Sequence, residues 1–215
     1  MNETAHLDEH QTRLAKLHQL KDAGIVTYAH KYDRTHTIAQ LREKSSSYHL
    51  PEAEMLMESG AANTSSIAGR MMMFRTHGKL SFAQLRDASG DIQIAFVRGK
   101  FRVFTGSTLV ESVQIADAEL SADKFVEKYL DVGDFIGVRG ELFMTKHGEL
   151  TLFVNEVQLL SKALRPLGDK WHGIEDIEKK LRKRYLDTTM DPDTKAMLVR
   201  RSHFWQAMRT FLLHA

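Results

Sequence analysis

The sequence predicts a mainly β fold with helices at both ends, in which five strands form a barrel. Apolar and polar residues alternate in short segments between about residues 62 and 160, as strands require. Before and after that region, apolar residues recur at helical spacing instead. One helical segment separates three strands from two more, and this order is the layout of an OB-fold, a five-stranded partly open barrel. The predicted domains are a helical extension over 1–61, the barrel over 62–160 and a helical linker region over 161–215.

The N-terminal extension contains three predicted helices. Leucines at helical spacing indicate the first over about residues 7–23. The second covers about 37–44, and either Thr35 or Thr37 is suited to cap its start. A third short helix over about 51–57 begins with a proline, which fits the first turn of a helix.

Three strands are predicted before the central helix. An apolar run over 67–74 forms the first, and residues 79–87 and 92–97 alternate cleanly. The turn Ser89-Gly90-Asp91 joins the second strand to the third.

The connection after the third strand, residues 98–116, is long for an OB-fold. Its apolar residues favour a separate hairpin built from 101–104 and 108–115. The central helix is then predicted over 118–130, where Val132-Gly133-Asp134 ends it.

Two further strands, 135–145 and 150–160, complete the barrel around a four-residue turn. After a linker over 162–170, helices are predicted over about 173–187 and from 193 towards 215. The apolar face of the last helix has no later segment to pack against, which indicates a longer protein that has been truncated.

Composition excludes several classes of protein. The chain has no cysteine, so disulfides, thiolate catalysis and cysteine-based zinc sites are excluded. No apolar run approaches the ~18–20 residues that span a bilayer, and the N-terminus lacks the layout of a signal peptide. We therefore expect a cytoplasmic protein that does not bind membranes. The net charge of only +2 means that any nucleic-acid surface must come from local clustering.

The second and third strands present the strongest candidate binding surface. Alternation places Phe82, Gln84 and Arg86 on one face of the second strand. Gln93 joins them if the small and aliphatic residues face the core. An exposed aromatic ring beside amides and a guanidinium suits the stacking and reading of an unpaired base. The pattern alone leaves open the alternative that Phe82 packs inside the barrel.

Other chemical signals are weak. The basic run over 179–184 is suited to phosphates, but the acidic residues just before it favour an ordinary solvated helix. The 11 histidines do not have the spacing of metal ligands, so we expect no metal site. The sequence contains none of the common nucleotide-binding or hydrolase motifs, and we assign no catalytic residue.

Several stretches together resemble the lysyl-tRNA synthetases of bacteria. The strongest is Lys162-Ala163-Leu164-Arg165-Pro166-Leu167-Gly168-Asp169-Lys170-Trp171-His172-Gly173, which continues to Arg184-Tyr185-Leu186-Asp187. It is similar to that family's linker into the catalytic domain. The others are similar to its OB-fold: Ala68-Gly69-Arg70-Met71-Met72, Gly78-Lys79-Leu80-Ser81-Phe82 through Leu85-Arg86-Asp87, and Gly140-Glu141-Leu142-Phe143 with Thr145-Lys146-His147-Gly148-Glu149-Leu150.

This resemblance implies binding of a tRNA with a lysine anticodon. In the family, the central anticodon uridine stacks on the residue that matches Phe82 and is read by the residue that matches Gln93. Glu149 matches a glutamate that takes part in anticodon recognition, and Arg70 and Arg75 match basic positions of the first strand. We add Gln84 and Arg86 as further anticodon contacts. Phosphate contacts are expected from Lys79 and Lys146.

The intact family member is a class II homodimer that attaches lysine to tRNA with ATP and Mg. Residues 201–213 resemble the opening helix of the first class II motif, but the later motifs that bind ATP do not follow. Gly168 replaces a usual proline, and Phe74 stands where a basic residue is frequent. We expect no bound cofactor and no ligase activity from these residues alone. The alternative is a stand-alone OB-fold module, a truncated paralogue that binds nucleic acid or protein.

Overall fold

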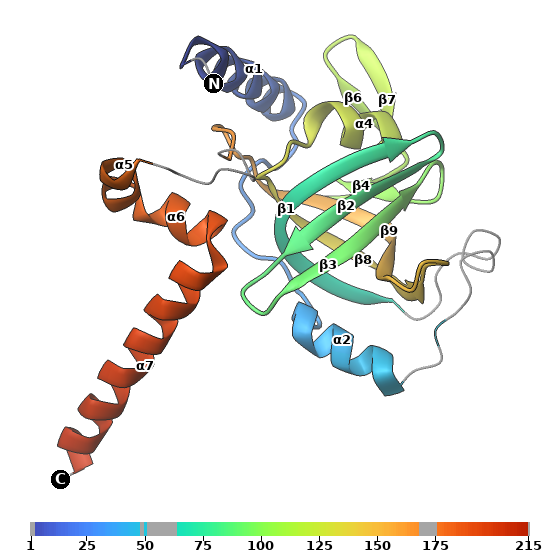
Figure 1. Cartoon of the computed structure of the whole chain (residues 1–215). Helices are drawn as coiled ribbons and strands as arrows, with labels where there is room; N and C mark the ends of the chain where they lie inside the picture. Colours follow the sequence, from blue (N-terminus) through green and yellow to red (C-terminus); the bar gives the residue numbers. More distant parts are fainter. Residues whose placement is uncertain (1–2, 48–49, 51–63, 168–175, 215) are drawn as a thin grey trace. The chain divides into compact units, whose positions relative to one another are not determined.

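The computed structural model describes residues 3–47, 50, 64–167 and 176–214 (Figure 1). The chain divides between Pro166 and Leu167 into two compact units. None of the described helices is long and apolar enough to cross a membrane. The helix predicted over 51–57 lies outside the described residues.

Five strands of the first unit form a closed ring (Figure 1). β1 (Ser65–His77) pairs antiparallel with β2 (Leu80–Arg86) and with β8 (Phe135–Met144). β2 also pairs antiparallel with β3 (Asp91–Val97), and β8 with β9 (Leu150–Ser161). Parallel pairing between β3 and β9 closes the ring. The predicted five-stranded OB-fold is confirmed.

β1 bends so that it can pair on both sides. Its first half lies along β8 and its second half along β2, with a bulge between Met71 and Met73. At Gly69 a Cβ atom would lie 2.5 Å from the carbonyl oxygen of Arg86, so the strands approach this closely only with glycine there. Gly140 on β8, beside a second bulge, is similarly packed against the backbone of Phe153.

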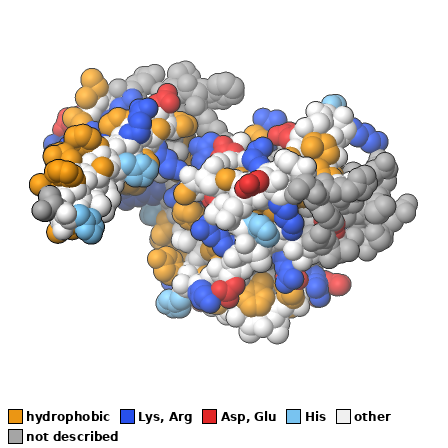
Figure 2. All heavy atoms as spheres, turned by 90° about the horizontal axis from the view of Figure 1, so that it is seen from below, with side chains coloured by type: hydrophobic (Ala, Val, Ile, Leu, Met, Phe, Trp, Pro, Cys, Tyr) orange, Lys and Arg blue, Asp and Glu red, His pale blue; other side chains and the backbone are white. Residues whose placement is uncertain are grey.

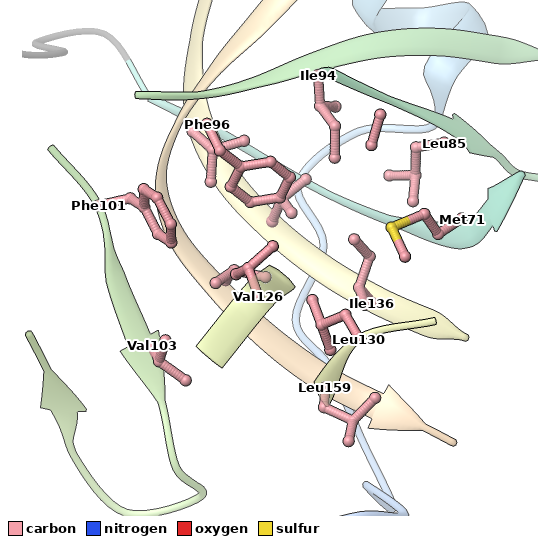
Figure 3. Packing of buried hydrophobic residues seen from close by; sticks show 14 of the residues in the cluster. Met71, Leu85, Ile94, Phe96, Phe101, Val103, Val126, Leu130, Ile136 and Leu159 are labelled. Atoms are coloured by element: carbon pink, nitrogen blue, oxygen red, sulfur yellow. The ribbon is translucent and has the colours of Figure 1, made fainter. Parts of the chain in front are cut away.

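Alternate side chains of the strands fill the barrel, and α4 (Ala122–Tyr129) closes one end. Phe125 and Val126 of α4 are buried in the same cluster as the inner residues of β2 and β3. Those inner residues are Ala83, Leu85, Ile92, Ile94 and Phe96. Figure 3 shows Val126 beside Phe96 and Phe101, with Met71 and Leu85 further along the same core.

The segment before α4 differs from the prediction. β4 (Arg102–Phe104) and β5 (Leu109–Val110) form the first part of the expected hairpin, and β4 also runs parallel to β9. β6 (Ser112–Ile115), however, pairs with β7 (Ala118–Ser121). The predicted start of the helix at residue 118 is therefore wrong, because α4 begins only at Ala122.

A tight turn explains this error. Val113 and Ile115 are buried against the core, and pairing places Leu120 and Ala118 opposite them. Ala116 in the turn has φ 52°, in the left-handed region that two-residue hairpin turns require. The helix-forming residues at 118–120 are therefore held in a strand by cross-strand pairing, which overrides their local propensity.

The N-terminal extension contributes α1 (Glu3–Asp22) and α2 (Ile38–Ser47). Thr37 caps α2 in a reciprocal arrangement with Gln40. The Gln40 N–H donates to Thr37 Oγ1 at 3.2 Å, and the Thr37 N–H donates to Gln40 Oε1 at 2.8 Å. Of the two predicted caps, Thr37 is therefore the one that takes this role.

The second unit contains α5 (Ile177–Arg182), α6 (Arg184–Met190) and α7 (Pro192–His214). The single helix predicted over 173–187 is wrong, because Lys183 leaves the helical backbone with φ −119° and ψ 51°. One non-helical residue hardly changes the apolar spacing, so the pattern did not reveal the break. Many large apolar side chains of α7 are exposed, and such side chains gather along this unit in Figure 2.

Candidate nucleic-acid interface

A row of side chains crosses the outer face of the barrel. Arg75 of β1 pairs with Phe82 of β2. Ala95 of β3 lies on the other side of Phe82 and pairs in turn with Phe153 of β9. Phe82 is half-buried, whereas Ala83, which follows it in β2, points into the core and is fully buried. Phe82 therefore lies on the outer face and not in the barrel core.

Phe82 rests on a second apolar cluster that is separate from the core. Its members are Leu80, Phe82, Ala95, Val97, Phe143 and Phe153. The rings of Phe143 and Phe153 meet edge to face, with centroids 6.4 Å apart. This cluster supports Phe82 from beneath, and the part of Phe82 that remains exposed is available to a flat apolar ligand.

A second row runs beside the first. Gln84 of β2 pairs with Gln93 of β3, which pairs with Thr151 of β9. Gln93 Nε2 donates to Thr151 Oγ1 at 2.9 Å, and Gln84 Nε2 lies 3.4 Å from Asp91 Oδ2. The two amides thus lie side by side on the same face as Phe82, two residues further along the paired strands.

Arg86, a predicted anticodon contact, forms an ion pair within the barrel. Its Nε and Nη2 atoms donate to the two carboxylate oxygens of Asp91 at 2.5 and 2.7 Å. These hydrogen bonds raise the pKa of Arg86. Both partners are partly exposed, and the ion pair fastens the ends of β2 and β3 together.

Arg70 lies on the part of β1 where the pairing changes from β8 to β2. Its Nη1 donates to the carbonyl oxygen of Gly133 at 2.9 Å, and its guanidinium carbon lies 4.3 Å from the ring centre of Phe135. Burial lowers the pKa of Arg70. The structure therefore engages Arg70 in contacts within the barrel, away from the row that contains Phe82.

The remaining predicted contacts are exposed. Arg75 lies near the end of β1, and Lys79 occupies the turn between β1 and β2. Lys146 and Glu149 lie in the turn between β8 and β9. That turn is closed by Thr145, whose Oγ1 accepts from the Glu149 N–H at 3.0 Å. Glu149 is thereby placed beside the second row, two residues before Thr151.

Sequence reasoning missed several members of this surface. Phe153 and Thr151 could have been placed by alternation, because Leu152 and Val154 are apolar and point into the core. Asp91 could have been paired with Arg86, since the two lie close to the predicted turn on opposite sides of one predicted hairpin. Phe143 gave no such signal, because its neighbour Leu142 is equally apolar and also buried.

In the described part of the chain, the histidines and the basic run over 179–184 form no further candidate site. No group of three or more histidine or acidic side chains there is placed to hold a metal ion. In the basic run, Arg182 pairs with Glu178 and Arg184 with Asp187. On the face of the molecule in Figure 2, basic and acidic side chains are interspersed, so no broad basic patch appears there.

Comparison with known proteins gives two findings. A tRNA anticodon family model, described as an OB-fold nucleic acid binding domain, matches residues 66–160. The lysine–tRNA ligase of Bacillus subtilis (strain 168) is 40% identical over 205 residues, which cover 95% of this chain and 36% of that protein. The lysine–tRNA ligase of Moorella thermoacetica is 36% identical over 200 residues, which cover 93% of this chain and 35% of that protein. The chain thus spans about a third of the length of these curated relatives.

Proposed function

Because the chain is a homologue of the lysine–tRNA ligases and carries an anticodon-type OB-fold, we propose that it binds tRNA at the anticodon. The specific ligand we propose is a tRNA with a lysine anticodon, bound on the outer face of β2 and β3. One observation carries this proposal: Phe82 lies half-buried on that face, with part of its ring accessible, beside two amides. Single-stranded bases are bound in this way, by stacking on a ring and hydrogen bonding at their edges.

The proposed roles follow the geometry. Phe82 stacks on the central anticodon base, and Gln93 and Gln84 contact its edge. Glu149 contacts a neighbouring base from the turn between β8 and β9. Arg75, Lys79 and Lys146 contact phosphates, which adds affinity and salt dependence without sequence preference. Arg70 and Arg86 remain in our proposal as supports of this surface, since their charged groups already have partners.

Titration of anticodon stem-loops tests the proposal. Loops with uridine or another central base are titrated against the wild-type chain, Phe82→Ala and Gln93→Ala at one salt concentration. Phe82→Ala should weaken binding to every loop by roughly 1–3 kcal/mol, because it removes the stacking surface. Gln93→Ala should mainly reduce the preference for uridine. If Phe82→Ala binds as tightly as the wild type, the base does not stack on Phe82. If the wild-type chain binds all loops with the same affinity, it does not read the anticodon.

We further propose that the ligase reaction belongs to a longer parent protein, a homodimer in the cytoplasm that uses ATP and Mg. The relatives are named for joining lysine to tRNA, and this chain aligns with about a third of each. Residues 1–215 alone should therefore give only background signal in an ATP–pyrophosphate exchange assay with lysine. Lysine-dependent exchange above background would contradict this prediction.

A further inference from the structure

Thr151 on β9 is buried between Gln93 and Glu149, two proposed contacts of the anticodon. Its side chain is fully inaccessible to solvent, so its hydroxyl depends on protein partners. Thr151 Oγ1 lies 3.2 Å from the carbonyl oxygen of Glu149 and 2.9 Å from Nε2 of Gln93. The hydroxyl therefore links the turn between β8 and β9 to the glutamine of β3.

The direction of this chain of hydrogen bonds is fixed by its first member. A backbone carbonyl oxygen can only accept, so the Thr151 hydroxyl must donate its single hydrogen to Glu149. The hydroxyl oxygen can then only accept from Gln93. Within the Gln93 amide, only the NH₂ group donates, so it faces Thr151 and Oε1 faces away.

Oε1 of Gln93 is left as an open acceptor. Within the described residues no group donates to it, and it is not among the buried polar atoms that lack a partner. The Gln84 amide has the same orientation. The Asp91 carboxylate, which is paired with Arg86, can only accept a hydrogen bond, so the NH₂ group of Gln84 faces it. The surface beside Phe82 thus presents amide oxygens with fixed orientation.

We propose that Thr151 is a positioning residue that selects the base by holding Gln93 Oε1 outward as an acceptor. This inference rests on the proposed function, in which the base stacks on Phe82. Uracil presents a ring N–H at N3, and guanine presents one at N1, so both donate to Oε1. Cytosine and adenine present a bare ring nitrogen at the same edge, which repels Oε1. The device separates uracil and guanine from cytosine and adenine, but it does not separate uracil from guanine.

Paired substitutions at Thr151 test this proposal. Thr151→Val keeps the branched shape and removes the hydroxyl, whereas Thr151→Ser keeps the hydroxyl. Thr105→Val is the matched control, since the Thr105 hydroxyl donates to the Thr108 carbonyl in an exposed turn. Each folded variant, checked by circular dichroism and thermal melting, is titrated with stem-loops carrying uridine, cytidine or guanosine at the central position.

In Thr151→Val the Gln93 amide can rotate by half a turn and present its NH₂ group to the base in place of Oε1. The preference for uridine over cytidine should then fall about tenfold, which corresponds to ~1.4 kcal/mol. The preference for uridine over guanosine should stay as in the wild type. Thr151→Ser and Thr105→Val should keep both preferences. A structural collapse of the surface would reduce both preferences together, so the two ratios distinguish positioning from folding.

Each other outcome overturns the inference in a recognisable way. If Thr151→Val keeps the wild-type preference for uridine over cytidine, Thr151 does not position the reader, and anticodon binding itself stands. If both preferences fall equally, or if Thr151→Ser behaves like Thr151→Val, the hydroxyl is not the cause. If the wild-type chain has no preference, the proposed function fails as well. If Thr151→Val does not fold, Gln93→Ala replaces it as the test. Gln93→Ala should lose the preference for uridine over cytidine and keep the preference for uridine over guanosine. Loss of both preferences would refute the proposed role of Gln93 Oε1.

Discussion

At the scale of single residues, the candidate interface is ordered by groups that can only accept hydrogen bonds. The Asp91 carboxylate holds Arg86 and Gln84, and the Glu149 carbonyl acts through Thr151 on Gln93. Each acceptor removes a choice of orientation from its partner before any ligand arrives. Binding then loses less side-chain entropy, since the donors and acceptors are already placed.

Two basic residues near this surface have partners within the barrel. Arg70 donates to the carbonyl oxygen of Gly133, and Arg86 is paired with Asp91. The alternation of β2 placed Phe82 and Gln84 on one face, but it left open whether that face is the outer one and whether Gln93 shares it. It could not reveal that Gln93 bonds Thr151, because that contact joins residues 58 positions apart and depends on the pairing of β3 with β9.

At the scale of elements, α2 is attached to the barrel through its first turn. The Ile38 N–H donates to Asp87 Oδ2 at 3.0 Å, and the Ala39 N–H donates to Ser89 Oγ at 2.9 Å. Asp87 Oδ1 also accepts from Ser89 and from the Gly90 N–H. One carboxylate therefore caps α2 and shapes the turn between β2 and β3, so the helix and the turn depend on each other.

This attachment predicts a dependence on pH. Burial on its own would raise the pKa of Asp87, but the hydrogen bonds from Ser89, Ile38 and Gly90 outweigh it and lower the pKa below its ordinary value. A carboxyl group with a lowered pKa in the folded state stabilises the fold at higher pH. That stability is present above the ordinary pKa of 3.8 and is lost as the pH falls through the lowered pKa.

Asp87→Asn should therefore lower the free energy of unfolding by about 1 kcal/mol at neutral pH, as loss of a helix cap does. The variant should also lose less stability on acidification than the wild type, because the titrating group is gone. Denaturant unfolding between neutral and acidic pH measures both effects. Asp117→Asn, in the exposed turn between β6 and β7, is the control and should follow the wild-type curve. An Asp87→Asn curve parallel to the wild type would exclude this account.

Elements differed in how well their pattern predicted them. The barrel strands β1, β2 and β3 have seven or more residues, and β2 alternates between buried and half-buried positions along its whole length, so the sequence signal for them is strong. β7 has only four residues, and its pairing with β6 decides its conformation. Short segments of this kind depend on their neighbours, which local propensity does not record.

At the scale of the whole first unit, a buried ionic network joins the extension to the barrel. Lys162, at the end of β9, donates to Asp134 Oδ2 at 2.7 Å and to Asp131 Oδ2 at 2.5 Å. Lys16 of α1 also donates to Asp131, at 2.7 Å. Arg13 of α1 reaches the backbone carbonyls of Val132 and Ala163. These contacts tie α1, the turn before β8 and the exit of β9 together.

The sequence could not predict this network. Lys162 begins the segment read as a linker, where a solvated lysine is the ordinary expectation. Asp134 was read only as part of the signal that ends the central helix. The partners are separated by 28 residues or more along the chain, and only closure of the barrel brings them together. The barrel could thus be predicted from the hydrophobic pattern, whereas its buried ion pairs could be identified only from the three-dimensional fold.

Removal of Lys162 tests how much this network contributes. Its side chain is 1% exposed and that of Asp134 is fully buried, so Lys162→Met leaves the Asp134 carboxylate without a cation, whereas Asp131 keeps Lys16. Breaking a buried ion pair on one side costs about 3–5 kcal/mol, and we expect a loss of that size in denaturant unfolding at neutral pH. Lys16→Met is the matched control. Its ion pair is more exposed, at 21% and 18% for the two side chains, and should cost about 1 kcal/mol or less.

The double variant Lys162→Met with Asp134→Asn should recover part of the loss, because it removes the buried charge that Lys162→Met leaves unpaired. Acidic pH should also reduce the difference in the free energy of unfolding between Lys162→Met and the wild type. Burial already raises the pKa of Asp134, and protonation of a buried carboxyl without a cation removes the charge that destabilises the variant. If Lys162→Met costs no more than Lys16→Met, or if the gap widens in acid, the buried network does not hold α1 and β9 together in the way that its geometry indicates.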